Sequence, residues 1–317
     1  MSKMIAGRLT RLVLTLLVVT FITFISTNLL PGDSVNALIP IEAQQDREFV
    51  EQIREEWGLN DPMVVRYGRW LGDAVQGDLG RSLVTGQPVT DEITHRLPIT
   101  LELMAVAIGL ALLIAVPLGV FTGYREGRRS DRVISGLAQA GLSLPGFVIG
   151  LILIYVFALR LHWFPAVGWN RLSDGLGPNL KTVALPALSL AVIEIAVYTR
   201  VLRSDMIATL KENYILSARA KGLTNRFILF RHGLRPSLLT LVTVVGLNIG
   251  LLIGGTLVIE YLFAIPGIGK RLFSAIQQRD FMMIQAITIV ITVFYVFINT
   301  ITDLVYMVVD PRIRKTN

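Results

Sequence analysis

The chain has 317 residues, of which 53% are apolar and only 17% are charged, and its formal net charge is +7. A soluble domain usually carries about 25% charged residues, so this composition excludes an ordinary soluble enzyme and predicts that lipid surrounds much of the surface. Cysteine is absent, which excludes disulfides, thiolate catalysis and cysteine-based metal sites. We expect an all-α polytopic membrane protein.

Six segments are long and apolar enough to cross a bilayer, which takes roughly 20 mostly apolar residues. They are residues 12–30, 99–122, 133–159, 182–199, 236–259 and 281–302. The first segment exceeds the roughly 7–15-residue core of a signal peptide, and no small-residue cleavage site follows it. We therefore interpret it as a retained span.

Charge predicts the orientation of these spans. Six spans place both termini on one side, and if that side is cytoplasmic, the inner segments carry 18 of the 30 Lys and Arg residues and five of the 23 acids. Cytoplasmic loops are enriched in Lys and Arg. The termini are thus predicted to be cytoplasmic, in a cell inner or plasma membrane. A nucleic-acid partner is disfavoured, because no basic patch is interleaved with exposed aromatics.

Three regions follow from this topology. Residues 1–30 form a tail and the first span, residues 31–97 an extracytoplasmic subdomain, and residues 98–317 a five-span core. The core contains a long inner loop, residues 200–235. We expect the subdomain to cover the core, although its amphipathic helices would also suit the outer leaflet.

Two short helices are predicted in the outer subdomain. The first runs from Glu42 to Trp57 and ends at Gly58. Spacing of four places one apolar face on it, formed by Phe49, Ile53 and Trp57. The second begins with Asp61 as N-cap and Pro62 at the first helical position. It carries Tyr67, Trp70 and Leu71.

The third span contains Pro145-Gly146, which predicts a kink in one long helix. His162-Trp163-Phe164-Pro165 follows this span. Since Trp favours the headgroup level, this segment is interpreted as an interfacial anchor, without a ligand role for His162.

The inner loop 200–235 predicts a helix-turn-helix. Asn213 would cap a helix over residues 214–221, and Gly222 lies where a left-handed residue ends a helix, with Leu223 available for the apolar contact that follows. Thr224 or Asn225 would cap a second helix, residues 226–231, which Gly233 and Pro236 would end. A loop between two spans needs only a few residues. One with two capped helices is expected to dock onto a partner.

Residues 214–236 resemble the coupling loop of ABC-importer permeases. The Glu-Ala-Ala-type positions of that loop fall on Leu216, Ser217 and Ala218, with Gly222 in register. The acid is missing and Pro236 falls one place late. The run from Ala218 to Leu223 is, however, similar to that of the dipeptide and oligopeptide permeases.

Further motifs that resemble this family occur in order along the chain. They are Leu30-Pro31-Gly32-Asp33, Gly58-Leu59-Asn60-Asp61-Pro62, Gly77-Asp78-Leu79-Gly80, Arg96-Leu97-Pro98-Ile99-Thr100-Leu101-Glu102, Ser143-Leu144-Pro145, Pro266-Gly267-Ile268-Gly269 and Asp310-Pro311-Arg312-Ile313-Arg314. The chain is thereby identified as a B-type permease subunit of a dipeptide, oligopeptide, nickel or glutathione importer. The motifs leave the choice among these substrates open.

The resemblance implies a heterodimer with a homologous permease, two cytoplasmic ATPase subunits and an extracytoplasmic substrate-binding protein. It implies contact with the ATPases through the residues of the loop, namely Tyr214, Ser217, Ala218, Arg219, Ala220, Lys221, Gly222 and Leu223. The chain itself has no Walker A motif, because the run ending in Lys270 lacks the upstream glycine and has Arg271 in place of Ser or Thr. We therefore expect no enzyme and no cofactor here, with ATP and Mg in the partner subunits.

Acids lie in or beside four spans, at Glu102, Glu194, Glu260 and Asp303. An intramembrane charge is costly and faces a cavity or a partner. Glu194 is the deepest, and we expect it either to line the path of a substrate amine or to pair with a partner subunit. The candidate pathway or gate residues are Glu194, Asn248, Gly254 and Glu260.

Gly246, Gly250 and Gly254 recur every four residues, which predicts close helix packing, with a hinge at Gly254-Gly255 as the alternative. Two other classes of protein are disfavoured. A membrane protease lacks a base, because all three histidines fall in loops far from Ser143. An ion-coupled carrier would show internal repeats. Three scattered histidines also disfavour a metal site.

Overall fold

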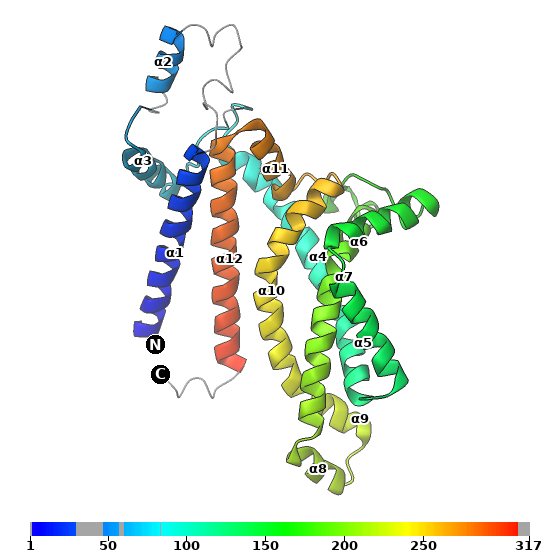
Figure 1. The fold of residues 1–317 in the computed structure, drawn as a ribbon. Helices are drawn as coiled ribbons and strands as arrows, with labels where there is room; N and C mark the ends of the chain where they lie inside the picture. The colour runs from blue at the N-terminus through cyan, green and yellow to red at the C-terminus, as the bar shows by residue number, and fades with distance from the viewer. Residues whose placement is uncertain (1, 30–46, 57–59, 83, 310–317) are drawn as a thin grey trace. The chain divides into compact units, whose positions relative to one another are not determined.

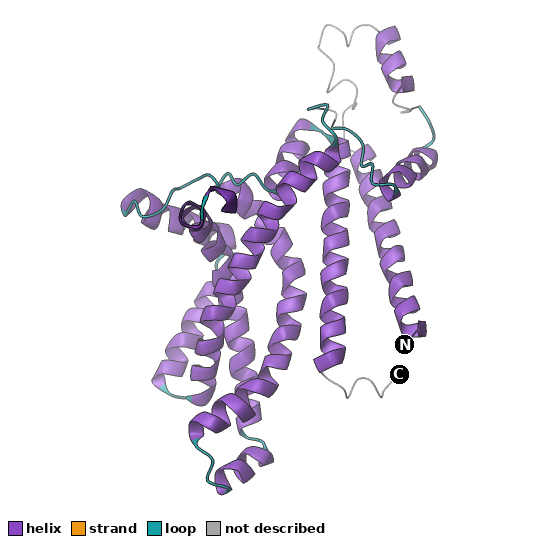
Figure 2. Cartoon of the chain, turned by 180° about the vertical axis from the view of Figure 1, so that it is seen from behind, coloured by secondary structure: helices purple, strands orange, loops and turns teal. Residues whose placement is uncertain are grey.

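The computed structural model describes residues 2–29, 47–56, 60–82 and 84–309. These residues form helices and loops, and within them the only strand-like feature is an isolated bridge between Arg81 and Pro88 (Figure 2). The predicted all-α class is confirmed. The helices are α1 (Ser2–Leu29), α2 (Arg47–Glu56), α3 (Met63–Val75), α4 (Val89–Tyr124), α5 (Arg129–Leu142), α6 (Gly146–Leu153), η2 (Ile154–Arg160), η3 (Leu172–Asp174), α7 (Leu176–Leu210), α8 (Asn213–Ala220), α9 (Asn225–Phe227), η4 (Ile228–Leu234), α10 (Arg235–Leu262), α11 (Ile268–Gln278) and α12 (Phe281–Val309), as labelled in part in Figure 1.

The chain divides into two compact units. Unit 1 comprises Met1–Ile99 and Gly267–Val296, and unit 2 comprises Thr100–Pro266 and Phe297–Asn317. The helices α4 and α12 each contribute to both. The two units are described separately.

In unit 1, α3 packs on α1 through aromatic side chains. The Tyr67 hydroxyl lies 2.7 Å from Thr20 Oγ1, and its ring contacts Phe24 and stacks on Trp70. The predicted helix through Tyr67 and Trp70 is therefore present. Its predicted cap is wrong, because Pro62 occupies the N-cap position and Asp61 instead accepts a hydrogen bond from Arg69 at 2.9 Å. The apolar face predicted for the preceding helix is formed by Phe49, Ile53 and Trp57, whose side chains lie outside the described part of the structure.

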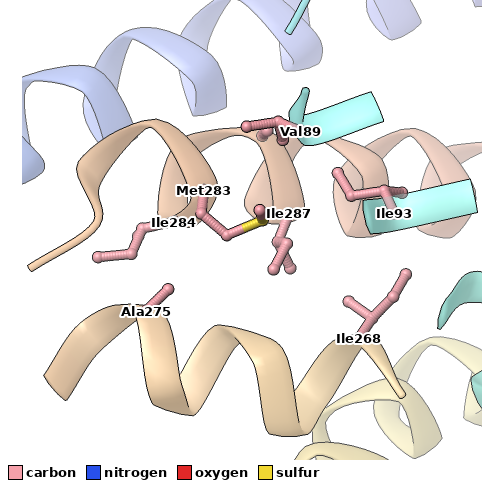
Figure 3. Close-up of a cluster of buried hydrophobic side chains, with 8 residues drawn as sticks. Val89, Ile93, Ile268, Ala275, Met283, Ile284 and Ile287 are labelled. Atoms are coloured by element: carbon pink, nitrogen blue, oxygen red, sulfur yellow. The ribbon is translucent and has the colours of Figure 1, made fainter. Parts of the chain in front are cut away.

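The core of unit 1 joins the start of α4 to α11 and α12. Its members are apolar and buried, as Figure 3 shows for Val89, Ile93, Ile268, Ala275, Met283, Ile284 and Ile287. Beside it, the buried Arg271 guanidinium donates to Glu92 Oε2 at 2.6 Å and to Asp280 Oδ2 at 2.9 Å. Because a buried charge needs a partner, this cluster fixes α11 against the first turns of α4 and α12.

In unit 2, α7 lies at the centre, against α5, α6 and α10 (Figure 1). Two glycines of α4 allow a close approach to α7. A Cβ at Gly119 would lie 2.9 Å from Leu202 Cβ, and one at Gly123 would lie 2.7 Å from Met206 Cβ. Small residues four apart permit such contact between membrane helices. On the fifth span, a Cβ at Gly246 would overlap the side chain of Thr302, whereas one at Gly254 would meet nothing within 4 Å, so the predicted close packing is present at Gly246 and not at Gly254.

The third predicted span is broken rather than kinked. The pair formed by α5 and the segment 146–160 is bent by 102°. The break falls at the predicted Pro145, which becomes the N-cap residue of α6. Packing explains the large angle, because a Cβ at Gly150 would lie 2.8 Å from Leu262, so α6 lies directly on the end of α10.

Four helices of the described chain are long and apolar enough to cross a membrane, and the bent pair makes up to five. They are Val89–Tyr124, Leu176–Leu210, Asn225–Leu262 and Phe281–Thr302. A shorter apolar helix covers Val13–Ser26.

Candidate functional site

The predicted turn of the inner loop is present in detail. Gly222 has φ +77°. Its N–H donates to Arg219 O at 2.9 Å, and the N–H of Leu223 donates to Ala218 O at 3.2 Å. This pair of bonds is a Schellman motif, which satisfies carbonyls at the end of α8 and requires a left-handed residue. The start of α8 differs from prediction, because Glu212 is the N-cap residue and Asn213 is the first residue of the helix.

The sequence predicts that the second helix of the loop ends at Gly233 and Pro236. In the structure this helix continues past both residues. It begins at Thr224, whose Oγ1 accepts from Phe227 N at 3.4 Å. It then continues through η4 into α10, so one helical segment covers Asn225–Leu262. Proline has no N–H to offer to the carbonyl four residues back. The Tyr214 hydroxyl donates to that carbonyl, His232 O, at 3.2 Å, which compensates for the missing bond.

A small core holds the two arms of the loop together. Ile215 and Ala218 of α8 and Ile228 of η4 are buried, with Leu210 packed against them. The Tyr214 hydroxyl adds its bond to His232, and partial burial, with a smaller effect of the Glu212 carboxylate, raises the pKa of Tyr214 above its ordinary value. The phenol therefore remains a donor at neutral pH. The loop is a preformed element rather than a flexible connection.

The exposed surface of the inner loop is apolar and basic. Seven of the eight predicted contact residues are exposed, and Ala218 is buried in the loop core. The exposed apolar side chains are Tyr214, Leu216, Leu223, Phe227 and Phe230, and the exposed cations include Arg219, Lys221, Arg226 and Arg231. Aromatic and arginine side chains together are characteristic of protein interfaces.

Two of the four predicted pathway residues come together in a pocket. Asn248 Nδ2 of α10 donates to Glu194 Oε2 of α7 at 3.0 Å, although 54 residues separate them. Both line a pocket of about 370 Å³. The other lining residues are Gly146, Phe147, Leu190, Ile193, Val197, Leu251, Leu252, Gly255, Val258 and Ile259. The pocket thus has an apolar wall with one carboxylate and one amide.

The other two pathway candidates lie outside this pocket. Gly254 is exposed, and a Cβ there would have no neighbour within 4 Å in the described chain. Glu260 is fully buried and accepts from Thr100 Oγ1 at 2.6 Å. Glu102 likewise accepts from Asn179 Nδ2 at 2.6 Å. The side chain of Asp303 lies outside the described part.

An ion pair that sequence reasoning missed joins α5 to α7. The Arg203 guanidinium donates to both carboxylate oxygens of Asp131, at 2.5 and 2.8 Å, and Asp131 also accepts from Gly127 N. Opposite charges 72 residues apart give no local signal in the sequence.

Within the described residues, no group of three or more His, Cys, Asp or Glu could hold a metal ion.

Comparison with known families decides the class of this chain. Residues 115–315 match the family described as "Binding-protein-dependent transport system inner membrane component", and residues 1–104 match its N-terminal counterpart. The chain belongs to this family. It is a multi-pass inner-membrane permease component of an ABC importer, a transporter component and not itself an enzyme, and the family implies a partner ATPase and a binding protein.

Curated relatives cover almost the whole chain. The oligopeptide transport system permease protein AppB of Bacillus subtilis (strain 168) is 42% identical over 302 residues, 94% of this chain and 95% of the relative. The probable peptide ABC transporter permease protein y4tP of Sinorhizobium fredii is 35% identical over 314 residues, 99% of this chain and 100% of the relative.

Among solved structures, an inward-facing form of the MetNI methionine ABC transporter matches with a TM-score of 0.58. It is 17% identical and covers 69% of this chain and 96% of the matched chain. This similarity shows the fold of an ABC importer permease.

Proposed function

We propose that this chain is one of two homologous permease subunits in an ATP-driven importer of di- or oligopeptides. The observation that carries the proposal is the preformed inner loop, which occurs in a chain whose curated relatives are named as peptide permeases. Nickel and glutathione are the alternative substrates that the sequence motifs leave open. The named relatives favour peptides.

The inner loop is the docking element for the ATPase subunits. Its exposed surface combines apolar side chains with arginine and lysine, and its shape is held by the buried core around Ile215. Such an element transmits force because it is continuous with the rest of unit 2. The helix α7 ends at Leu210, just before α8, and α9 continues into α10.

The pathway through this chain passes the pocket of Glu194 and Asn248. The two helices that carry this pair, α7 and α10, are the same two helices that enter and leave the docking loop (Figure 1). A displacement of the loop by the ATPases therefore changes the distance between α7 and α10. The heterodimer, the two ATPases and the binding protein complete the proposed assembly, with ATP and Mg in the ATPases.

We place six spans in the membrane, with both termini in the cytoplasm. Four long apolar helices and the bent pair account for five, and α1 supplies the sixth. The docking loop and the basic segment 125–129 then lie on the cytoplasmic side, in agreement with the positive-inside rule. The role of Gly254 as a gate and that of the region 31–97 as a cover stay predictions.

Purification of the tagged chain from its native membrane tests this assembly. We expect a second, homologous permease and ATPase subunits to co-purify, and mass spectrometry identifies them. A chain that purifies alone, in a detergent that keeps a known ABC importer intact, would contradict the proposal.

A further inference from the structure

The pocket between α7 and α10 holds a carboxylate without a cation. Glu194 is 6% exposed, and the side chains that interact with it are neutral, namely the amide of Asn248 and the phenol of Tyr198. In the part of the chain that the structure describes, no Lys, Arg or His nitrogen lies within 4.0 Å of it. An unpaired acid at the middle of a membrane helix costs roughly 2.5–3.5 kcal/mol on insertion scales. A counter-charge from outside the chain would offset this cost.

The pocket also has the size and chemistry of a ligand site. Small-molecule sites are clefts of roughly 300–1,000 Å³ with apolar walls and a few placed polar groups. This one has about 370 Å³. A pocket of this volume can hold the end of a peptide but not a whole long peptide. Its wall is formed by side chains such as Ile193, Val197 and Leu252, with the polar groups confined to Glu194 and Asn248.

Two other intramembrane carboxylates of the described chain lie outside this pocket. Glu102 and Glu260 accept hydrogen bonds from Asn179 and Thr100, as Glu194 does from Asn248, but neither lines the pocket. Glu194 combines a position in the span with an opening into a cavity.

We propose that Glu194 and Asn248 form a transient intramembrane subsite for the ammonium group of a translocating peptide. The carboxylate binds the ammonium as an ion pair, and Asn248 holds the carboxylate in place from α10. The apolar wall contacts the adjoining residue of the peptide. This inference rests on the proposed function as a peptide permease. The affinity is expected to be weak, because a pathway site must also release its ligand.

Thiol labelling in the assembled complex tests the subsite directly. The chain has no cysteine, so Leu251→Cys or Val258→Cys introduces a single thiol into the pocket wall, at positions that are 75% and 50% exposed. Labelling of this chain is read by its mass, with trialanine at millimolar concentration as the probe and N-acetyl-trialanine as the control. We expect trialanine to slow labelling at least threefold and the acetylated peptide to leave it unchanged.

Two charge variants complete the test. Glu194→Gln keeps the shape and removes the charge, so protection by trialanine should be lost, whereas Glu102→Gln should retain it. Equal protection by both peptides, protection that survives Glu194→Gln, or no protection by either peptide would overturn the subsite. Loss of the complex in Glu194→Gln would also overturn it, in favour of a pairing with the second permease. Peptide uptake by the unmodified complex is measured in parallel, and its absence would refute the proposed function instead.

Discussion

The turn at Gly222 gives the sharpest prediction for the docking loop. Its φ of +77° lies in the left-handed region, and a Cβ there would meet no atom within 4 Å. A substitution is therefore opposed by backbone strain and not by a clash. The left-handed conformation costs an L-residue roughly 1–2 kcal/mol, and a β-branched side chain resists it most. We expect Gly222→Val to pay this cost in full.

The strain converts into a loss of docking. About 1.4 kcal/mol corresponds to a factor of ten in an equilibrium constant. The ratio of loops with the native turn to loops with a distorted turn therefore falls by roughly five- to thirtyfold. Because only the native turn presents α8 correctly, the apparent affinity for the ATPase subunits falls by up to the same factor. The measurement is the amount of ATPase that co-purifies with the tagged permease, together with the peptide uptake rate.

Two control variants separate the turn from general strain. Gly222→Asn should be close to wild type, because asparagine tolerates the left-handed region. Gly127 also has φ +77° and open space around it, but it lies outside the docking loop. Gly127→Val should therefore retain the ATPases. Normal co-purification in a well-expressed Gly222→Val variant, or equal loss in Gly127→Val, would refute the reasoning.

Two further predictions concern packing and ion pairs in unit 2. Gly123→Leu should lower the yield of intact complex on native gels, because overpacking costs about 1–3 kcal/mol, whereas Gly109→Leu on the same helix meets open space and should be tolerated; equal yields would contradict the close approach of α4 to α7. Asp131→Ala should lower the free energy of unfolding by about 1–3 kcal/mol, since it leaves the Arg203 side chain without its charged acceptor. Glu126→Ala, which removes an exposed pair with Lys211, should change stability by less than about 1 kcal/mol, and a similar loss in both variants would show that the buried position of Asp131 is irrelevant.

Local patterns allowed much of this fold to be predicted. The turn at Gly222 depends on a few adjacent residues, and glycine at the end of a helix indicates it directly. The apolar spans are equally local, because bilayer thickness fixes their length. The break at Pro145 was located from the proline, but its angle of 102° depends on the contact of Gly150 with the end of α10.

Features that depend on tertiary contacts could not be predicted in the same way. Pro236 indicates a helix end, yet the helix continues because the Tyr214 hydroxyl, 18 residues from His232, satisfies the free carbonyl. Glu194 and Asn248 were each candidates, but their hydrogen bond joins two helices and has no signal in either one. The same holds for the ion pair of Asp131 with Arg203.

Import of a labelled tripeptide into proteoliposomes tests most directly whether this chain is half of an ATP-driven peptide pathway. The vesicles contain this chain, its homologous permease and the ATPases, with binding protein added on the outer side of the complex. We predict uptake that requires ATP and the binding protein and that disappears when this chain is omitted. Uptake that persists without the ATPases and follows an ion gradient would contradict this account and indicate a secondary carrier.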